Sequence, residues 1–240
     1  MFQVNIFTLY PEFFPGLLDA GNYRRARVNK IWDFNIVNLR EFTGSNQRAD
    51  DKPFGGGSGM VIKAEVISKA LNKYKNGFEK VLLSPRGLKL DQNLVENYKN
   101  KTGLNLICGH FEGVDQRVID KENIKEISIG DYVLSGGESA SFVFLDAIVR
   151  TLPGVLGDPK SLNEESFSGD LLEYPQYTQP RDWNGIEVPE VLLSGNHAEI
   201  KNWRLEQSRS ITQRQRPDLW QKYTKTVSYT HLRAHETLLD

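Results

Sequence analysis

The chain has little cysteine, no long apolar run and almost no net charge. Cys108 is the single cysteine among 240 residues, which excludes an internal disulfide framework and a zinc site built from several cysteines. No stretch is apolar enough to span a bilayer, and the N-terminal MFQVNIFTLYPEFF lacks the basic lead and apolar core of a signal peptide. These absences predict a cytoplasmic protein that has no membrane segment. The net charge of -1 neither favours nor excludes a nucleic-acid partner, because the distribution of charge decides that question.

Several familiar ligand-binding motifs are also missing, although glycine is concentrated in loops. The GGGSG sequence at 55–59 lacks the Gly-Lys-Ser/Thr ending of a phosphate-binding P-loop, and it does not follow a strand with GxGxxG spacing. The sequence GESAS at 137–141 lacks the closing glycine of a hydrolase nucleophile elbow. HLRAH at 231–235 lacks the glutamate of a zinc-protease motif. P-loop, dinucleotide, hydrolase and zinc-protease chemistry are therefore disfavoured.

Short apolar segments with strand character alternate with amphipathic helical segments along the first two thirds of the chain. The predicted strands are 2–7, 31–38, 80–83, 104–108 and 126–129, and the predicted helices are 11–18, 63–76, 91–101 and 139–152. This alternation is typical of βαβ units, so it predicts an α/β protein with a parallel sheet.

Three of the predicted strands end in loops that contain glycine. The loops are SPRG at 84–87, GHFEG at 109–113 and GDYVLSGG at 130–137. The carboxyl ends of parallel strands meet at one edge of a sheet, where open α/β proteins bind their ligands. A single such loop is common in any βα unit, but three of them predict a composite pocket.

The composition changes after Pro153-Gly154. Residues 158–180 are acidic and rich in turns, and we predict that they link a catalytic domain at 1–157 to a small helical domain at 181–225. In that domain, Ser194-Gly195-Asn196 is expected to cap a helix that carries Ile200 and Trp203. Between 201 and 225 the positive residues outnumber the negative ones; they are Lys201, Arg204, Arg209, Arg214, Arg216, Lys222 and Lys225. A basic helical module favours RNA or DNA, although an ordinary solvated helix face is about equally common.

The last fifteen residues, TVSYTHLRAHETLLD at 226–240, differ in character from everything before them. They resemble translated sequencing-adaptor read-through. We therefore interpret them as a non-native tail and assign them no function.

Seven segments, in this order, resemble the bacterial tRNA (guanine-N(1)-)-methyltransferases. They are DDKPFGGGSGM, LLSPRG, ICGHFEGVDQR, SIGDYVLSGGE, PGVLGD, LLEYPQYTQP and VLLSGNHAEIKNWR. The resemblance extends from residue 1 to about residue 225, and seven co-ordered segments leave little room for chance.

The resemblance implies a fold, a reaction and a set of partners. The fold would be a knotted (trefoil) α/β methyltransferase domain with a small C-terminal helical domain, in a homodimer whose active site lies at the subunit interface. The reaction would transfer a methyl group from S-adenosylmethionine to N(1) of the tRNA guanosine that follows the anticodon. The residues that correspond to the family's methyl-donor pocket are Leu83, Ser84, Pro85, Gly109, Glu112, Gly113, Ile129, Gly130, Asp131, Tyr132, Val133, Leu134, Gly136 and Gly137.

The resemblance also assigns the catalytic residues. Arg150 takes the position of the family arginine, and Glu165 occupies the position of the family aspartate. Because Glu165 is one methylene longer than aspartate, Glu164 and Asp170 are alternative general bases. The family further suggests a Mg²⁺ requirement, but no acidic cluster in the sequence identifies a metal site.

Two other functions are open at this stage. One is a ribose 2′-O-methyltransferase of the same knotted superfamily, and the other is an RNA-binding protein that has the fold without the activity. The joint presence of a carboxylate and Arg150 beside the methyl donor would distinguish the leading hypothesis from both.

Overall fold

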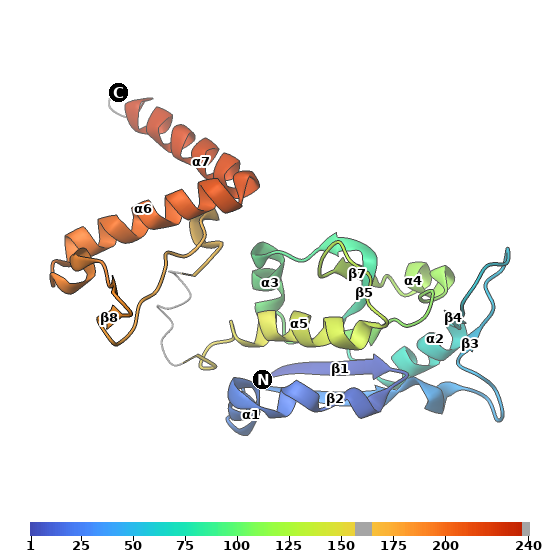
Figure 1. Ribbon diagram of the computed structural model, residues 1–240. Coiled ribbons are helices and arrows are strands. Elements are labelled where there is room, and N and C mark those ends of the chain that lie inside the picture. Colours follow the sequence, from blue (N-terminus) through green and yellow to red (C-terminus); the bar gives the residue numbers. More distant parts are fainter. Residues whose placement is uncertain (157–164, 237–240) are drawn as a thin grey trace. The chain divides into compact units, whose positions relative to one another are not determined.

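The computed structural model describes residues 1–156 and 165–236, and for residue 168 and residues 227–236 it describes the backbone alone. The chain divides into two compact units, Met1–Gly157 and Asp158–Asp240 (Figure 1). Each unit is described by itself below. Among the described residues, no helix combines the length and the apolar character that a membrane crossing requires.

The first unit is built on a five-stranded parallel sheet, which confirms the predicted α/β class. The strands lie in the order β2-β1-β6-β5-β7. Their bounds are β1 Phe2–Thr8, β2 Trp32–Asn38, β5 Glu79–Lys89, β6 Gly103–Cys108 and β7 Lys125–Ser128. The two-residue strands β3 (Asp50–Asp51) and β4 (Val61–Ile62) form a separate antiparallel ladder.

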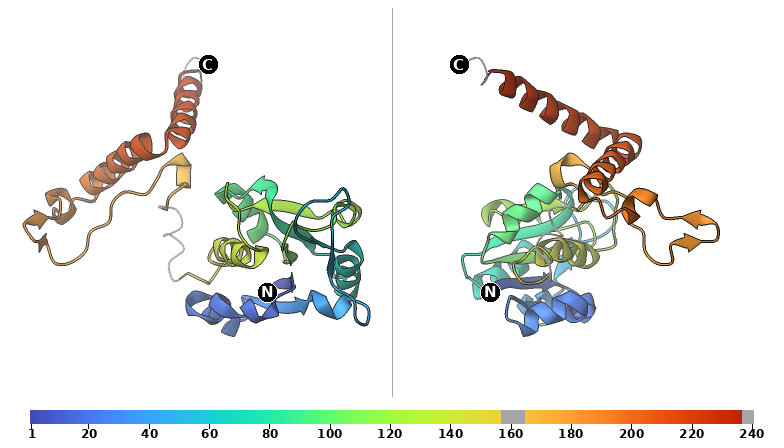
Figure 2. Two further views of the ribbon diagram at one scale, coloured as in Figure 1. Left: turned by 45° about the vertical axis from the view of Figure 1, so that its right-hand side comes forward. Right: turned by 90° about the vertical axis from the view of Figure 1, so that its left-hand side faces the viewer.

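Helices cover both faces of this sheet (Figure 2). Helices α1 (Gly21–Val28), α3 (Gln92–Lys99) and α5 (Gly137–Val149) contribute to one apolar core, and α2 (Ala64–Lys73) and α4 (Gln116–Lys121) contribute to the other. Because side chains alternate between the two faces of a strand, Val4 and Ile6 of β1 enter the first core while Phe7 enters the second. Both faces are thus buried, which explains why every residue of β6 is buried and why this strand is apolar apart from the hydrogen-bonded Asn105.

Three local predictions were wrong in detail. Strand β5 does not end before Ser84, because it continues through 84–87 with an irregular register between Leu83 and Leu88. The predicted helix at 11–18 consists of two 3-10 turns, Pro11–Phe13 and Gly16–Asp19, and Gly16 at the start of the second turn has a positive φ of 47°. Residues 21–28, which include Arg24, Arg25 and Arg27, form helix α1, where no helix was expected.

Helix α5 begins at Gly137, two residues before the predicted start. A Cβ atom at this position would lie 2.8 Å from both the Cα of Cys108 and the backbone nitrogen of Gly109. Only glycine allows the first turn of α5 to approach the end of β6 so closely. This contact positions the start of α5 beside the carboxyl edge of the sheet.

The second unit contains two long helices and a small hairpin. Its elements are the 3-10 turns Ser168–Asp170 and Glu190–Leu193, strands β8 (Asp182–Trp183) and β9 (Ile186–Glu187), and helices α6 (His197–Gln215) and α7 (Pro217–Glu236). Asn196 caps α6, as predicted, by accepting hydrogen bonds from the backbone nitrogens of Ala198 and Glu199. The hairpin was not predicted, although Asn184-Gly185, both with positive φ, is a strong turn signal.

Two acidic residues connect β5 to its neighbours through ion pairs. Burial alone would raise the pKa of Glu79, but hydrogen bonds from Lys101, Tyr98 and Lys125 outweigh it, so this pKa lies below the ordinary value of 4.5. The Lys80 ammonium donates to Glu122 at 2.7 Å and lowers the pKa of that carboxyl as well.

We expect these pairs to make the free energy of unfolding fall in acid. A carboxyl whose folded-state pKa is depressed stabilises the protein above its unfolded pKa, and this contribution is lost as the pH falls through the folded value. The urea midpoint should therefore be constant from pH 7 to about 5.5 and fall below about pH 4.5. Glu79→Gln should cost roughly 1 kcal/mol at pH 7 and show a shallower acid loss, whereas the exposed control Glu12→Gln should match the wild type. Equal acid profiles for Glu79→Gln and the wild type would contradict this account.

Candidate active site

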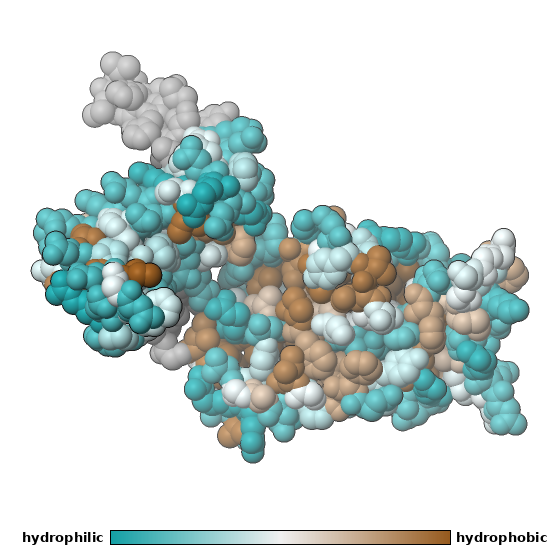
Figure 3. All heavy atoms as spheres, in the orientation of Figure 1, coloured by the Kyte–Doolittle hydropathy of each residue, from teal (hydrophilic) through white to brown (hydrophobic). Residues whose placement is uncertain are grey.

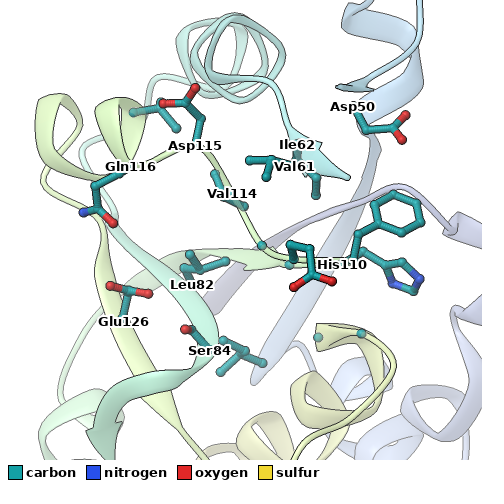
Figure 4. Close-up of a pocket in the computed structure, with 18 of the residues that line it drawn as sticks. Asp50, Val61, Ile62, Leu82, Ser84, His110, Val114, Asp115, Gln116 and Glu126 are labelled. Carbon is teal, nitrogen blue, oxygen red and sulfur yellow. The ribbon is translucent and has the colours of Figure 1, made fainter. Parts of the chain in front are cut away.

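Residues 82–86 of β5 and the loops that follow β6 and β7 line one cavity of about 1790 Å³. Figure 4 shows Ser84 and Leu82 on β5, with Asp115, Gln116 and Glu126 on one side of the cavity and His110 and Asp50 on the other. The cavity continues past the β3 and β4 ladder to α2 and α4, and these parts of its wall were not predicted from the sequence.

Thirteen of the fourteen residues expected in a methyl-donor pocket line this cavity. They are Leu83, Ser84, Pro85, Gly109, Glu112, Gly113, Ile129, Gly130, Tyr132, Val133, Leu134, Gly136 and Gly137. Asp131 is not among the lining residues. Its carboxylate is exposed and lies 3.2 Å from the Nζ atom of Lys89.

Backbone hydrogen bonds hold two of the loops together. The Gly137 nitrogen donates to the Gly109 carbonyl at 2.7 Å, and His110 and Gly136 form an isolated antiparallel bridge. Within the loop after β6, the Gly113 nitrogen donates to the His110 carbonyl at 3.0 Å. The spacing of the cavity walls is therefore set by backbone contacts, and it tolerates few side chains at the glycines.

The composition of the cavity wall suits an adenosyl ligand. Gly113 has a φ of 109°, and no atom lies within 4 Å of the place where its Cβ would stand, so its backbone is open to close approach. Apolar side chains of Leu83 and Ile129 offer surface to a purine ring, while the Ser84 hydroxyl and the Glu112 carboxylate offer polar partners. Mostly apolar walls with a few polar groups are typical of small-molecule sites.

A buried polar cluster next to this cavity was missed by the sequence analysis. Glu138 is only 2% exposed, and its Oε1 atom accepts a hydrogen bond of 2.7 Å from the Thr8 hydroxyl. Its Oε2 atom lies 3.5 Å from Nδ1 of His110. In the sequence, the position of Glu138 directly after Gly136-Gly137 was the one local signal for this cluster. Its partners Thr8 and His110 are brought to it only by the fold.

A second polar group fixes the opposite side of the cavity. Asp115 caps α4 and pairs with Arg117 at 2.6 Å, and the Arg117 hydrogen bond holds the pKa of Asp115 below its ordinary value. Arg86 donates to Glu126 at 3.0 Å and to Gln116 at 3.1 Å. These contacts join β5, β7 and α4 around the cavity rim.

The two predicted catalytic residues, Arg150 and Glu165, belong to different units of the chain. Arg150 follows the last residue of α5. Burial and a hydrogen bond to Asp146 raise the pKa of the nearby Tyr23 phenol, and the Arg150 charge opposes this rise only in part. The 13-residue helix separates Arg150 from Gly137 by about 20 Å at 1.5 Å per residue. Glu165 and Asp170 belong to the second unit, so the structure does not relate them to the cavity, and Glu164 lies outside the described residues.

Two other chemistries find no support at this site. Burial raises the pKa of the Cys108 thiol well above its ordinary value, so this cysteine is a packing residue and a poor nucleophile. Among the described residues, no group of three or more histidine, cysteine or acidic side chains is arranged to hold a metal ion.

The fold and the cavity define an α/β protein that binds its ligand in glycine-rich loops at the carboxyl ends of parallel strands. Comparison with known families is more specific, because residues 2–222 match the family described as tRNA (Guanine-1)-methyltransferase TrmD. The chain belongs to this family, which confirms the resemblance found in the sequence.

Named relatives agree with the family match. The chain is 56% identical to the tRNA (guanine-N(1)-)-methyltransferase of Pelagibacter ubique over 227 residues, which cover 94% of this chain and all of the relative. It is 48% identical over 225 residues to the enzymes of the same name from Brucella canis and Brucella ovis, covering 93% of this chain and 92% and 93% of theirs.

Proposed function

We propose that this protein transfers a methyl group from S-adenosylmethionine to N(1) of the tRNA guanosine that follows the anticodon. The observation that carries the proposal is the 56% identity to a tRNA (guanine-N(1)-)-methyltransferase over that relative's full length. The glycine-lined cavity also supports the proposal, because thirteen of the residues that the resemblance assigns to the methyl donor line this cavity. Family membership favours this function over a ribose methyltransferase or a binding protein without activity.

We propose that the three loops hold the methyl donor. The Ser84 hydroxyl would donate or accept hydrogen bonds, and the Glu112 carboxylate would accept them. Leu83 and Ile129 would contact the purine, and the backbone at Gly113 would allow close approach. When bound, S-adenosylmethionine supplies an electrophilic methyl group on a sulfonium. The protein's part is to orient this group toward the base and to exclude water.

The acceptor needs help from two side chains. Guanine N(1) carries a proton at neutral pH, so it is a poor nucleophile until a general base removes that proton. As the proton leaves, negative charge develops on O(6), where a fixed cation stabilises the transition state more than the ground state. We assign the base to Glu165 and the cation to Arg150. The target base would be turned out of its stack, because its pairing edge is otherwise blocked.

We propose that two copies of the chain form the complete site. Arg150 lies about one helix length from Gly137 at the cavity of its own chain, which favours a symmetric partner as the source of the arginine there. Exposed apolar side chains on α5 and the preceding loop support an interface; they are Tyr132, Val133, Leu134 and Val143. Figure 3 shows apolar side chains gathered over the part of the first unit where α5 lies in Figure 1.

The path of the chain around β7 supports the trefoil knot that the resemblance implies. Strand β7 lies at the edge of the sheet beside β5, yet α5 begins against the end of β6, on the far side of β5. Residues 129–136 must therefore cross the end of β5. We propose that this crossing passes through the loop after β5 and closes the knot.

We propose that the second unit binds tRNA and that the domain limits are those expected from the sequence, with a linker at 158–180, a tRNA-binding domain at 181–225 and a non-native tail at 226–240. Basic side chains on α6 and the first half of α7 support phosphate contacts. The salt dependence of tRNA binding measures the number of such contacts. We also propose a cytoplasmic location, which is consistent with a tRNA substrate. The Mg²⁺ requirement stays a prediction of the resemblance, and activity after chelation by EDTA tests it.

The test of the proposed function is a pair of tRNA transcripts that differ at one nucleotide. With guanosine after the anticodon, we expect incorporation of one methyl group per tRNA. With adenosine there, incorporation should fall at least about 10³-fold, because adenine N(1) has no proton for the base and no O(6) for the cation. Equal methylation of both transcripts would point to a ribose methyltransferase, and no methylation of either would point to a binding protein.

A further inference from the structure

A buried carboxylate connects three elements at the back of the donor cavity. Glu138 lies in the first turn of α5, and its Oε1 atom accepts from the hydroxyl of Thr8, which is fully buried at the end of β1. That hydroxyl also accepts a hydrogen bond of 2.9 Å from the Tyr10 nitrogen, so its proton is directed to Glu138. The other carboxylate oxygen faces His110, in the loop after β6.

His110 has a buried nitrogen that makes no hydrogen bond. The Nδ1 atom is shielded from solvent and has no hydrogen-bond partner among the described residues, although Oε2 of Glu138 lies only 3.5 Å away. The ring is held between Tyr10, at 4.6 Å between ring centroids, and Phe111, at 4.7 Å. A small movement of the loop after β6 toward Glu138 would give Nδ1 of His110 a hydrogen-bond partner. A buried nitrogen without such a partner destabilises the folded state.

His110 itself lines the cavity, and Glu138 lies next to a glycine that lines it. His110 is flanked by Gly109, and Glu138 by Gly137; both glycines line the cavity. A Cβ on Gly136 would lie 2.2 Å from Nδ1 of His110 and 2.4 Å from Oε2 of Glu138, so the loop passes immediately over the pair. Any change in the His110 to Glu138 distance therefore changes the spacing of the two glycine loops.

We propose that His110 and Glu138 are a positioning pair for the methyl donor and that protonation of His110 tightens donor binding. The imidazolium donates its Nδ1 proton to the buried carboxylate and draws residues 109–113 onto the start of α5. This inference rests on the proposed function, because it takes the cavity to be the donor site. His110 acts through the loop backbone and does not touch the reacting atoms.

The groups around His110 determine the direction of the pH effect. The Glu138 carboxylate on α5 favours the imidazolium form of His110. The Arg40 guanidinium opposes it from a longer range, because it lies 5.2 Å from the centroid of the Tyr10 ring that packs on His110. The other titratable neighbours are the buried Cys108 thiol on β6 and Glu112 in the same loop. A charge-assisted hydrogen bond is about twice as strong as a neutral one. Donor affinity should therefore fall as the pH rises and the imidazolium is lost.

The test measures binding of S-adenosylhomocysteine to the full chain by calorimetry between pH 5.5 and 8.5. For the wild type we expect the Kd to rise roughly tenfold across this range. His110→Asn places a neutral amide nitrogen near the position of Nδ1, so its Kd should stay close to the wild-type value at pH 8.5 throughout. The control His197→Asn changes an exposed histidine of the second unit and should keep the wild-type slope.

The possible outcomes separate this inference from the proposed function. If the wild type binds the ligand and His110→Asn has the same pH slope, or the wild type has no slope, the positioning pair is refuted. If the wild type does not bind at any pH, the proposed function fails and this inference fails with it. His110→Gln and Glu138→Gln should flatten the slope in the same way, and thermal unfolding identifies any variant that has lost its fold. Because ionisation of the ligand is common to all variants, it cancels in the comparison.

Discussion

Replacing Arg150 by alanine is expected to lower the turnover number of guanosine methylation by roughly 10²–10³-fold. The guanidinium is assigned to the charge that develops on guanine O(6), an interaction that is stronger in the transition state than in the ground state. The loss should therefore appear in kcat, while the Kd for S-adenosylhomocysteine changes less than about twofold. The matched control is Arg24→Ala, which removes an exposed arginine of α1.

A mixing experiment tests whether Arg150 acts on the cavity of a partner. The second variant is Ser84→Trp, which fills the donor cavity of its own chain and keeps Arg150. If equal amounts of the two inactive variants exchange subunits, half of the dimers are mixed, and each mixed dimer has one intact cavity served by one intact arginine. About a quarter of the wild-type activity should return. If no activity returns while mixed dimers form, Arg150 serves its own chain and the interface assignment is wrong.

Replacing Glu165 by glutamine is the second change with a large expected effect. Removal of the general base should lower the turnover number by roughly 10²–10⁴-fold, because glutamine keeps the shape and the hydrogen bonding but cannot accept the proton. Binding of the donor should be unchanged, since the donor cavity belongs to the first unit. The rate of the residual reaction should increase toward alkaline pH, where more of the substrate has already lost its N(1) proton.

Three matched variants identify which acid is the base. Glu165→Asp restores the shorter side chain of the family and should retain a substantial fraction of the activity. Glu164→Gln and Asp170→Asn remove the two alternative carboxylates and should leave turnover within about threefold of the wild type. If Asp170→Asn abolishes turnover and Glu165→Gln does not, the assignment passes to Asp170.

The elements that could be predicted from sequence are those with a strong local pattern. Residues 104–108 form a strand because an apolar run of this length, followed by glycine, has few other solutions. Asn196 was expected to cap a helix and does so, because the capping bonds are made within three residues. The predictions failed where local rules compete. Pro15 and Gly16 interrupt the helix expected at 11–18, and α1 has too little apolar periodicity to be recognised.

One part of the candidate site could be predicted from the sequence and another part could not. The three glycine-bearing loops could be identified, because parallel strands place their carboxyl ends at one edge. The cluster of Thr8, His110 and Glu138 could not be identified, since its members come from three elements that are up to 130 residues apart. No pattern of neighbouring residues indicates a contact between residues that lie so far apart in the sequence.

The sequence by itself determined the class of sheet, the family and the glycine-bearing segments that line the cavity, because these depend on periodicity and on motifs of a few neighbouring positions. Tertiary structure alone decided which side chains stand behind the donor loops and how far Arg150 lies from the cavity of its own chain. The reason is physical: the length of α5 is fixed by its 13 residues, but the direction in which it leaves Gly137 is set by the close packing of that glycine on Cys108. That packing turns a glycine motif into a cavity wall.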